Sequence, residues 1–103
     1  MKSITKEEIE QKLNEKQTFL IQYSASWCGP CRVLTPILEN VCDSESVDIF
    51  KFDISTDPEY AKTKKIMSIP YVEFIKNGKL VAHKVGSAPR EFYEEQLKEV
   101  LLS

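Results

Sequence analysis

The stretch Trp27-Cys28-Gly29-Pro30-Cys31 joins two segments of different character. The run Phe19-Leu20-Ile21-Gln22-Tyr23 precedes it, and a short, nearly continuous apolar run is typical of a strand covered on both faces. After it, apolar residues recur at helical spacing, at Val33, Leu34, Ile37, Leu38 and Val41. The sequence therefore predicts a buried strand, then a helix from about Cys28 to Cys42 with both cysteines at its N-terminus.

Outward from this junction, signals for further elements alternate between helix and strand. Thr5 and Glu8 fit a capping box that begins a helix ending near Lys16. The remaining expected elements are a strand over 47–52, a helix over 58–65 opened by Asp57-Pro58, a hairpin of 71–76 and 79–84 around Asn77-Gly78, and a last helix opened by Pro89. The order α-β-α-β-α-β-β-α predicts an α/β fold, with a central mixed β-sheet flanked by helices on both faces.

Length and charge limit the functions that this chain can have. Its 103 residues are enough for one domain, which we expect to span 1–103. With 14 Lys and Arg against 16 Asp and Glu, the formal net charge is -2, which argues against nucleic acid and against an anionic membrane surface as partners. No apolar segment near the N-terminus resembles a signal peptide, so we expect a cytoplasmic protein.

The position of the cysteine pair indicates redox chemistry. At a helix N-terminus, free backbone N–H groups and the helix dipole favour an anion, so the pKa of the Cys28 thiol is expected to be lowered. Cys31 lies one turn further on, close enough to form a disulfide with Cys28. Gly29 permits close backbone approach, and Pro30 lies in the first turn, where its missing N–H costs little. Arg32 adds nearby positive charge.

Three other interpretations of the pair are weaker. A zinc site needs four ligands, and beyond the pair the chain offers only Cys42 and His83. A structural disulfide is uncommon in a reducing compartment. Two inert buried thiols are a third alternative, because free cysteine is often buried. Cys42, at the far end of the helix, is interpreted as a small residue of the core or its edge, with no part in exchange.

Taken together, these features resemble the thioredoxin family over nearly the whole length, from about Phe19 to Leu101. The resemblance rests on linked features at fixed spacing: Trp27-Cys28-Gly29-Pro30-Cys31, Pro36, Lys51, Ile69-Pro70, Phe74 to Gly78, and Val85-Gly86. A bare C-x-x-C would be a weak signal. The Trp-Cys-Gly-Pro-Cys stretch with Ile-Pro about 40 residues later is highly specific.

The resemblance implies a protein-disulfide reductase with a defined site. Cys28 would attack, Cys31 would resolve, and Pro70 would be cis beside the disulfide. A shallow substrate surface would comprise Trp27, Ile54, Ile69, Val85, Gly86 and Ser87. The implied partners are substrate proteins with disulfides and a thioredoxin reductase. The implied mechanism uses no metal and no organic cofactor, and because nothing in the sequence points to an oligomer we expect a monomer.

The chain departs from the family at several positions near this site. Gln22 stands where the family usually has a buried Asp, which together with the Lys is thought to take the proton from the second cysteine. Gln cannot accept that proton at neutral pH, so Lys51 lacks its usual partner. Glu73 is a candidate replacement, unless strand alternation places it on the other face of the sheet. The remaining departures are Ser24, where the family often has Trp, and Ser68, where it often has Gly.

Gln22 predicts that resolution by Cys31 is slower than in an Asp-bearing relative, or uses water. Two alternatives to a general reductase stay open. One is a dedicated reductant of a single partner enzyme. The other is a binding module that uses the same surface as a scaffold, with redox chemistry incidental. An oxidase or isomerase is disfavoured by the Gly-Pro between the cysteines, which resembles reducing members of the family.

Overall fold

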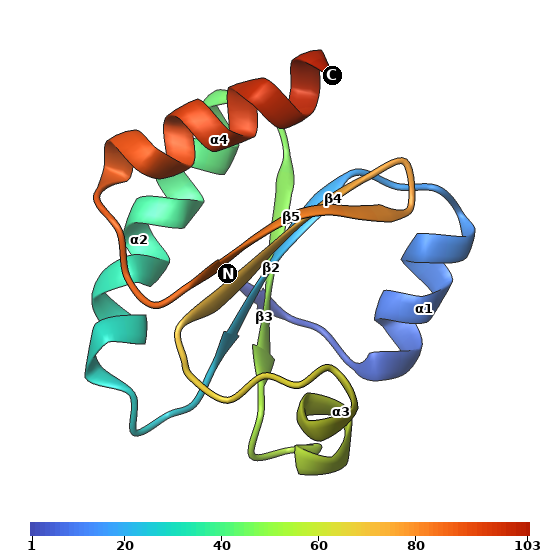
Figure 1. The fold of residues 1–103 in the computed structure, drawn as a ribbon, viewed down its shortest axis with the longest axis vertical. Helices are drawn as coiled ribbons and strands as arrows, with labels where there is room; N and C mark the ends of the chain where they lie inside the picture. The colour runs from blue at the N-terminus through green and yellow to red at the C-terminus, as the bar shows by residue number, and fades with distance from the viewer.

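The computed structural model describes residues 1–103 as a five-stranded sheet with helices on both faces (Figure 1). The elements are β1 (Lys2–Ser3), α1 (Lys6–Asn14), β2 (Phe19–Ser24), α2 (Gly29–Ser44), β3 (Asp48–Asp53), α3 (Pro58–Thr63), β4 (Tyr71–Lys76), β5 (Lys79–Val85) and α4 (Arg90–Leu102). The strand order is β1-β3-β2-β4-β5. Strand β2 pairs with β3 in parallel and with β4 antiparallel, so the predicted mixed sheet is confirmed.

All eight predicted elements are present, and their ends differ from the predicted ends by a few residues at most. The sequence analysis missed strand β1, in which Lys2 and Ser3 pair with Phe50 and Lys51 of β3. Two residues are too few to show the alternation that identifies a strand. No helix is both long enough and apolar enough to span a bilayer.

The sheet separates two apolar cores, because side chains alternate between its faces. Leu20, Val72 and Phe74 pack with residues of α2 and α4 on one face. Phe19, Ile21 and Tyr23 belong to the core on the opposite face, where α1 and α3 lie. The parity of a β2 residue therefore decides which core its side chain enters.

The hairpin between β4 and β5 turns at Asn77-Gly78, as predicted. Both residues have positive φ angles, 53° and 77°, which a two-residue hairpin turn requires. A Cβ added at Gly78 would lie 2.3 Å from the carbonyl oxygen of Leu13, so the turn packs closely against the end of α1. The hairpin brings the end of β5 back beside the start of β4, where Val85 pairs with Tyr71.

Candidate active site

Cys28 and Cys31 lie where β2 passes into α2. Cys28 is the N-cap residue of α2, and its Sγ accepts a hydrogen bond of 3.3 Å from the Cys31 backbone N–H. The two residues form a disulfide with a Cα–Cα distance of 5.4 Å. The predicted placement at the helix N-terminus is therefore confirmed, and the pair can switch between dithiol and disulfide.

The electrostatic surroundings of Cys28 favour a negative charge. Its sulfur occupies the position in which a capping group receives the first backbone N–H groups of a helix. No acidic residue lies in the first turn of α2. The exposed guanidinium of Arg32 is held nearby by donating to the Ser26 carbonyl. A thiol in such surroundings ionises more readily than a free one, and the thiolate is the nucleophilic form of cysteine.

On one side, the disulfide is bordered by apolar residues from distant parts of the chain. Ile54 and Ile69 pack against the small cluster of Ala25, Cys28 and Cys31. The Ile69–Pro70 peptide bond is cis. The Gly86 backbone N–H donates to the Pro70 carbonyl oxygen at 2.8 Å, which joins the end of β5 to this border.

The other residues of the expected substrate surface are accessible. Trp27 is 69% exposed and Val85 is 49% exposed, both high values for large apolar side chains. Ser87 is also exposed. A Cβ added at Gly29 would meet no atom within 4 Å, so this turn is open to an approaching chain. Met67 is 94% exposed two residues before Ile69, and the sequence analysis had not singled it out.

Beneath the disulfide lies a neutral hydrogen-bond network. The fully buried Gln22 donates from Nε2 to the Cys31 carbonyl oxygen at 3.1 Å. The Thr35 hydroxyl lies 2.9 Å from both Gln22 Oε1 and the Cys31 carbonyl oxygen, so it can donate to either. The network holds the first turn of α2 against β2 without an ionisable group. Thr35 carried no signal in the sequence, since a lone hydroxyl in a helix is ordinary.

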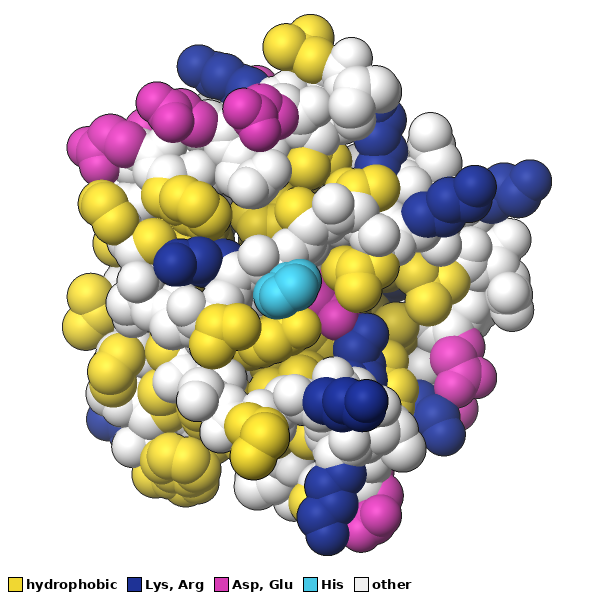
Figure 2. Space-filling view, in the orientation of Figure 1, with side chains coloured by type: hydrophobic (Ala, Val, Ile, Leu, Met, Phe, Trp, Pro, Cys, Tyr) yellow, Lys and Arg dark blue, Asp and Glu magenta, His cyan; other side chains and the backbone are white.

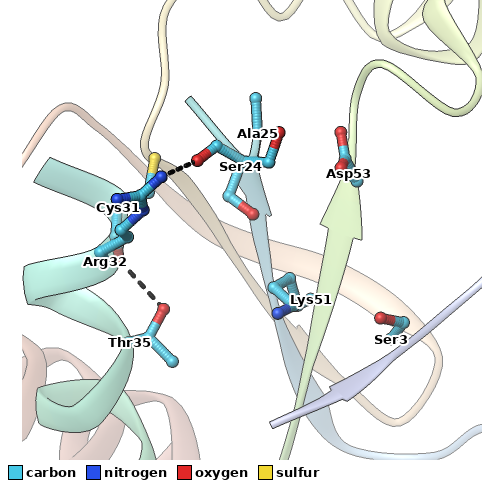
Figure 3. Close-up of a pocket in the computed structure, with 9 residues that line it drawn as sticks. Ser3, Ser24, Ala25, Cys31, Arg32, Thr35, Lys51 and Asp53 are labelled. Carbon is cyan, nitrogen blue, oxygen red and sulfur yellow. Dashed lines mark hydrogen bonds between the residues drawn. The ribbon is translucent and has the colours of Figure 1, made fainter. Parts of the chain in front are cut away.

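A cavity of about 410 Å³, lined mainly by polar residues, reaches Cys31 (Figure 3). Its walls come from the ends of three strands and the start of α2. The lining residues are Ser3, Ser24, Ala25, Ser26, Cys31, Arg32, Thr35, Lys51 and Asp53. Lys51, one of the positions that carry the family resemblance, therefore lines the same cavity as Cys31.

Glu73 does not replace the missing carboxylate, so that candidate role is wrong. In the pairing of β2 with β4, Glu73 is opposite Ile21, whereas Gln22 is opposite Val72. Glu73 thus lies on the other face of the sheet from Gln22 and Lys51. It is 1% exposed, accepts a hydrogen bond of 2.8 Å from the Tyr23 hydroxyl, and forms an ion pair of 2.6 Å with Lys64.

Cys42 is a free cysteine at the far end of α2 and is fully buried in the core, as predicted. Burial, with a smaller contribution from Asp48, raises the pKa of its thiol to about 12. The thiol stays protonated at neutral pH and is a poor nucleophile. Cys42 is therefore not suited to thiolate chemistry near neutral pH.

A dithiol pair at the N-terminus of a helix that follows a central strand, beside a cis-proline, defines a thiol–disulfide oxidoreductase. Comparison with known proteins supports this class. The family model described as Thioredoxin matches residues 1–99. The chain belongs to the thioredoxin family.

Individual relatives agree with this assignment. The chain is 33% identical over 101 residues to thioredoxin of Alicyclobacillus acidocaldarius, covering 96% of each chain. It is 36% identical over 100 residues to thioredoxin of Mycoplasmoides gallisepticum, covering 95% of this chain and all of the relative.

Solved structures share the fold. A mutant thioredoxin from Halobacterium salinarum NRC-1 has a TM-score of 0.86 at 19% identity, covering 97% of this chain and 88% of its own. Mitochondrial thioredoxin 3 from Saccharomyces cerevisiae has a TM-score of 0.84 at 24% identity, covering 96% and 94%.

Proposed function

We propose that this protein is a general protein-disulfide reductase that transfers electrons from a thioredoxin reductase to disulfides of substrate proteins. The observation that carries the proposal is the position of the Cys28 sulfur. It caps the N-terminus of α2 and belongs to the cluster against which Ile69 packs, immediately before the cis Pro70. A thiolate there is both stabilised by the helix and next to an open surface.

The reaction proceeds by two thiol–disulfide exchanges. The Cys28 thiolate attacks a substrate disulfide, a Cys28–substrate mixed disulfide forms, and one substrate sulfur leaves as a thiolate. Cys31 then loses its proton and attacks the Cys28 sulfur. The substrate's second sulfur leaves, so the substrate gains two electrons and the Cys28–Cys31 disulfide forms. The reductase returns two electrons to this disulfide.

The proposed substrate surface comprises Trp27, Ile54, Ile69, Val85, Gly86 and Ser87. The Ile69 backbone lies in the loop just before β4 and would pair with an extended substrate segment, in the way a peptide adds to a strand. The exposed side chains of Trp27 and Val85 supply apolar contact beside it. Pro70, which has no N–H, leaves the pairing to the residue before it.

We place this activity in the cytoplasm and in a monomer without a metal or organic cofactor. A reducing compartment keeps most thiol pairs reduced, so a pair on a helix N-terminus serves there as an electron donor. Its chemistry needs only the two sulfurs and an external reductase, because no step forms a bond to another group.

The decisive experiment is turnover of insulin disulfides with NADPH and a bacterial thioredoxin reductase. The protein is expected to support continuous NADPH oxidation, and Cys28→Ser to abolish it. Cys42→Ala is the matched control, and its turnover is expected to equal that of the wild type. Absence of turnover by the wild type, both with the reductase and with dithiothreitol as the electron source, would refute the proposed function.

Further measurements on these proteins separate the general reductase from the two alternatives, a dedicated reductant and a binding scaffold. A dedicated reductant would reduce insulin slowly with dithiothreitol but one partner enzyme rapidly. A scaffold would keep its partner affinity after Cys28→Ser and Cys31→Ser together. A reduction potential near roughly −120 mV, that of a strong oxidant, would argue for an oxidase instead.

A further inference from the structure

The resolving step needs a thiolate at Cys31, and the interior beneath the pair offers no base to form it. Cys31 is 2% exposed. Gln22 is neutral, and its amide is already engaged with the Cys31 carbonyl and with Thr35. The proton of Cys31 must therefore leave by another side of the residue.

The polar cavity supplies such a side. It reaches Cys31, and four of its lining residues carry hydroxyl groups: Ser3, Ser24, Ser26 and Thr35 (Figure 3). A polar space of about 410 Å³ is large enough for several water molecules, each with partners for its hydrogen bonds. Ser24 lines this space two residues after Gln22, on the same face of β2, and its small side chain takes up little of the volume.

Three ionised side chains line the cavity together with Cys31: Arg32 from α2, and Lys51 and Asp53 from β3. The register of β2 with β3 places Lys51 beside Gln22, and Asp53 beside Ser24. Asp53 Oδ1 accepts hydrogen bonds from the Ser55 N–H and hydroxyl, at 2.9 and 2.6 Å. None of the four salt bridges of the protein includes Lys51, although Asp53 lines the same cavity, so the Lys51 ammonium is available to a negative charge that forms there.

We propose that water in the cavity beside Ser24 takes the proton from Cys31 during resolution, and that the Lys51 ammonium stabilises the thiolate that results. This inference rests on the proposed function. The Cys31 S–H bond breaks and the proton passes through cavity water to solvent. The Cys31 thiolate forms the bond to Cys28 Sγ, the Cys28–substrate bond breaks, and its electron pair leaves on the substrate sulfur. Lys51 acts on Cys31 electrostatically, across the cavity, and makes or breaks no bond in this step.

The test measures the two exchanges separately. A peptide disulfide with a chromogenic leaving thiol reports formation of the mixed disulfide, and release of the second thiol reports resolution. Ser24→Trp fills the cavity with an indole and is expected to slow resolution at least tenfold at pH 7, with the first exchange unchanged. Ser24→Leu, a smaller change, provides the same test if the Trp variant does not fold.

A double variant makes the test specific for proton transfer. Gln22→Asp introduces a base beneath Cys31, so Ser24→Trp with Gln22→Asp is expected to resolve faster than Ser24→Trp alone. The control is Ser24→Trp with Gln22→Asn, because Asn has the length of Asp but no charge. This control is expected to give no rescue. Rescue by Asn as well as Asp would indicate a packing effect and would overturn the proposal.

Lys51→Met tests the electrostatic part. Loss of the ammonium is expected to raise the apparent pKa of resolution by about one unit, which lowers the thiolate fraction, and hence the rate at pH 7, about tenfold. Lys79→Met, on exposed β5, is the charge-matched control and is expected to leave the pH profile unchanged.

The outcomes distinguish this inference from the proposed function. If no mixed disulfide forms on Cys28 in the wild type, the proposed function fails. If it forms, and the folded Ser24 variants and Lys51→Met all resolve with wild-type rates and pH profiles, the proton route through the cavity is refuted while the function stands.

Discussion

Cys28 and Cys42 lie at opposite ends of α2, and their positions give the same thiol group opposite properties. Cys28 caps the N-terminus of α2, where the Cys31 backbone N–H donates to its sulfur. Cys42 lies in the apolar core near the C-terminus of α2, where burial disfavours the thiolate. The same residue type is therefore expected to react differently at the two positions, because the surroundings of each sulfur differ.

The buried thiol predicts how stability changes at alkaline pH. The pKa of Cys42 is raised from 9.0 to about 12, so the folded state holds the thiol proton more tightly than the unfolded state does. This contribution to stability is complete below about pH 9 and is lost as the pH rises towards 12. Between pH 8 and 10.5, Cys42 is expected to remove about 2 kcal/mol from the free energy of unfolding.

Comparison with Cys42→Ala isolates this effect, because burial also raises the pKa values of Tyr23, Tyr60 and Tyr93, which titrate in the same direction. Urea unfolding of both proteins, with the Cys28–Cys31 disulfide kept oxidised, measures the difference. The variant is expected to lose less stability than the wild type over this pH interval. If the free energy of unfolding fell equally with pH in both proteins, Cys42 would not contribute to the pH dependence of stability.

At the scale of elements, an ion pair joins α3 to the sheet. Lys64, directly after α3, reaches Glu73 of β4, and Tyr23 of β2 donates to the same carboxylate. Glu73 is almost completely buried, whereas the Lys64 side chain keeps 25% exposure. Ile69 and Pro70 lie between the two bonded elements, so the pair also anchors the loop that presents Ile69.

Removing one partner of this pair is expected to be costly. Lys64→Met leaves an uncompensated buried carboxylate and is expected to lower the free energy of unfolding by about 3 kcal/mol. Lys64→Met with Glu73→Gln removes both charges and keeps an acceptor for Tyr23, so it is expected to recover a large part of the loss.

Lys62→Met is the control, because Lys62 on the same helix is exposed and its variant is expected to change stability by less than about 0.5 kcal/mol. Denaturant unfolding at pH 7 measures all four proteins. If Lys64→Met were as stable as Lys62→Met, the ion pair would have no structural role.

At the scale of the whole molecule, the distribution of charge and the two edges of the sheet both favour a monomer. Acidic side chains gather over α4, and Lys and Arg are dispersed over the visible face (Figure 2). One sheet edge is β1, with only two residues, and the other is β5, which carries Lys79 and Lys84. Short edge strands and edge lysines oppose pairing with another sheet.

We therefore expect a monomer in solution, measured by sedimentation equilibrium with the pair oxidised and reduced. Lys79→Val with Lys84→Val removes the charges from the β5 edge and is expected to increase association with concentration. A wild-type dimer that persists on dilution would contradict this prediction and would require a contact surface other than the two edges.

Sequence reasoning succeeded where the signal is local and periodic. The capping box at Thr5, the turn at Asn77-Gly78 and the helical spacing after Cys31 each depend on neighbours within a few residues, and all three are present in the structure. Strand β1 was missed because two residues carry no period. Glu73 was misassigned because its face depends on the register of β4 against β2, which no local signal specifies.

By itself, the order of residues determined that Cys28 begins a helix after a buried strand, since backbone preference and apolar spacing act over short distances. Only the tertiary structure decided which groups surround the pair: Ile54 and Ile69 pack against its cluster, and the cavity that Ser24 and Lys51 line reaches Cys31. Those neighbours come from strands and loops far apart in the chain. Their meeting depends on sheet register and on packing across two cores, both of which are set by the whole fold at once.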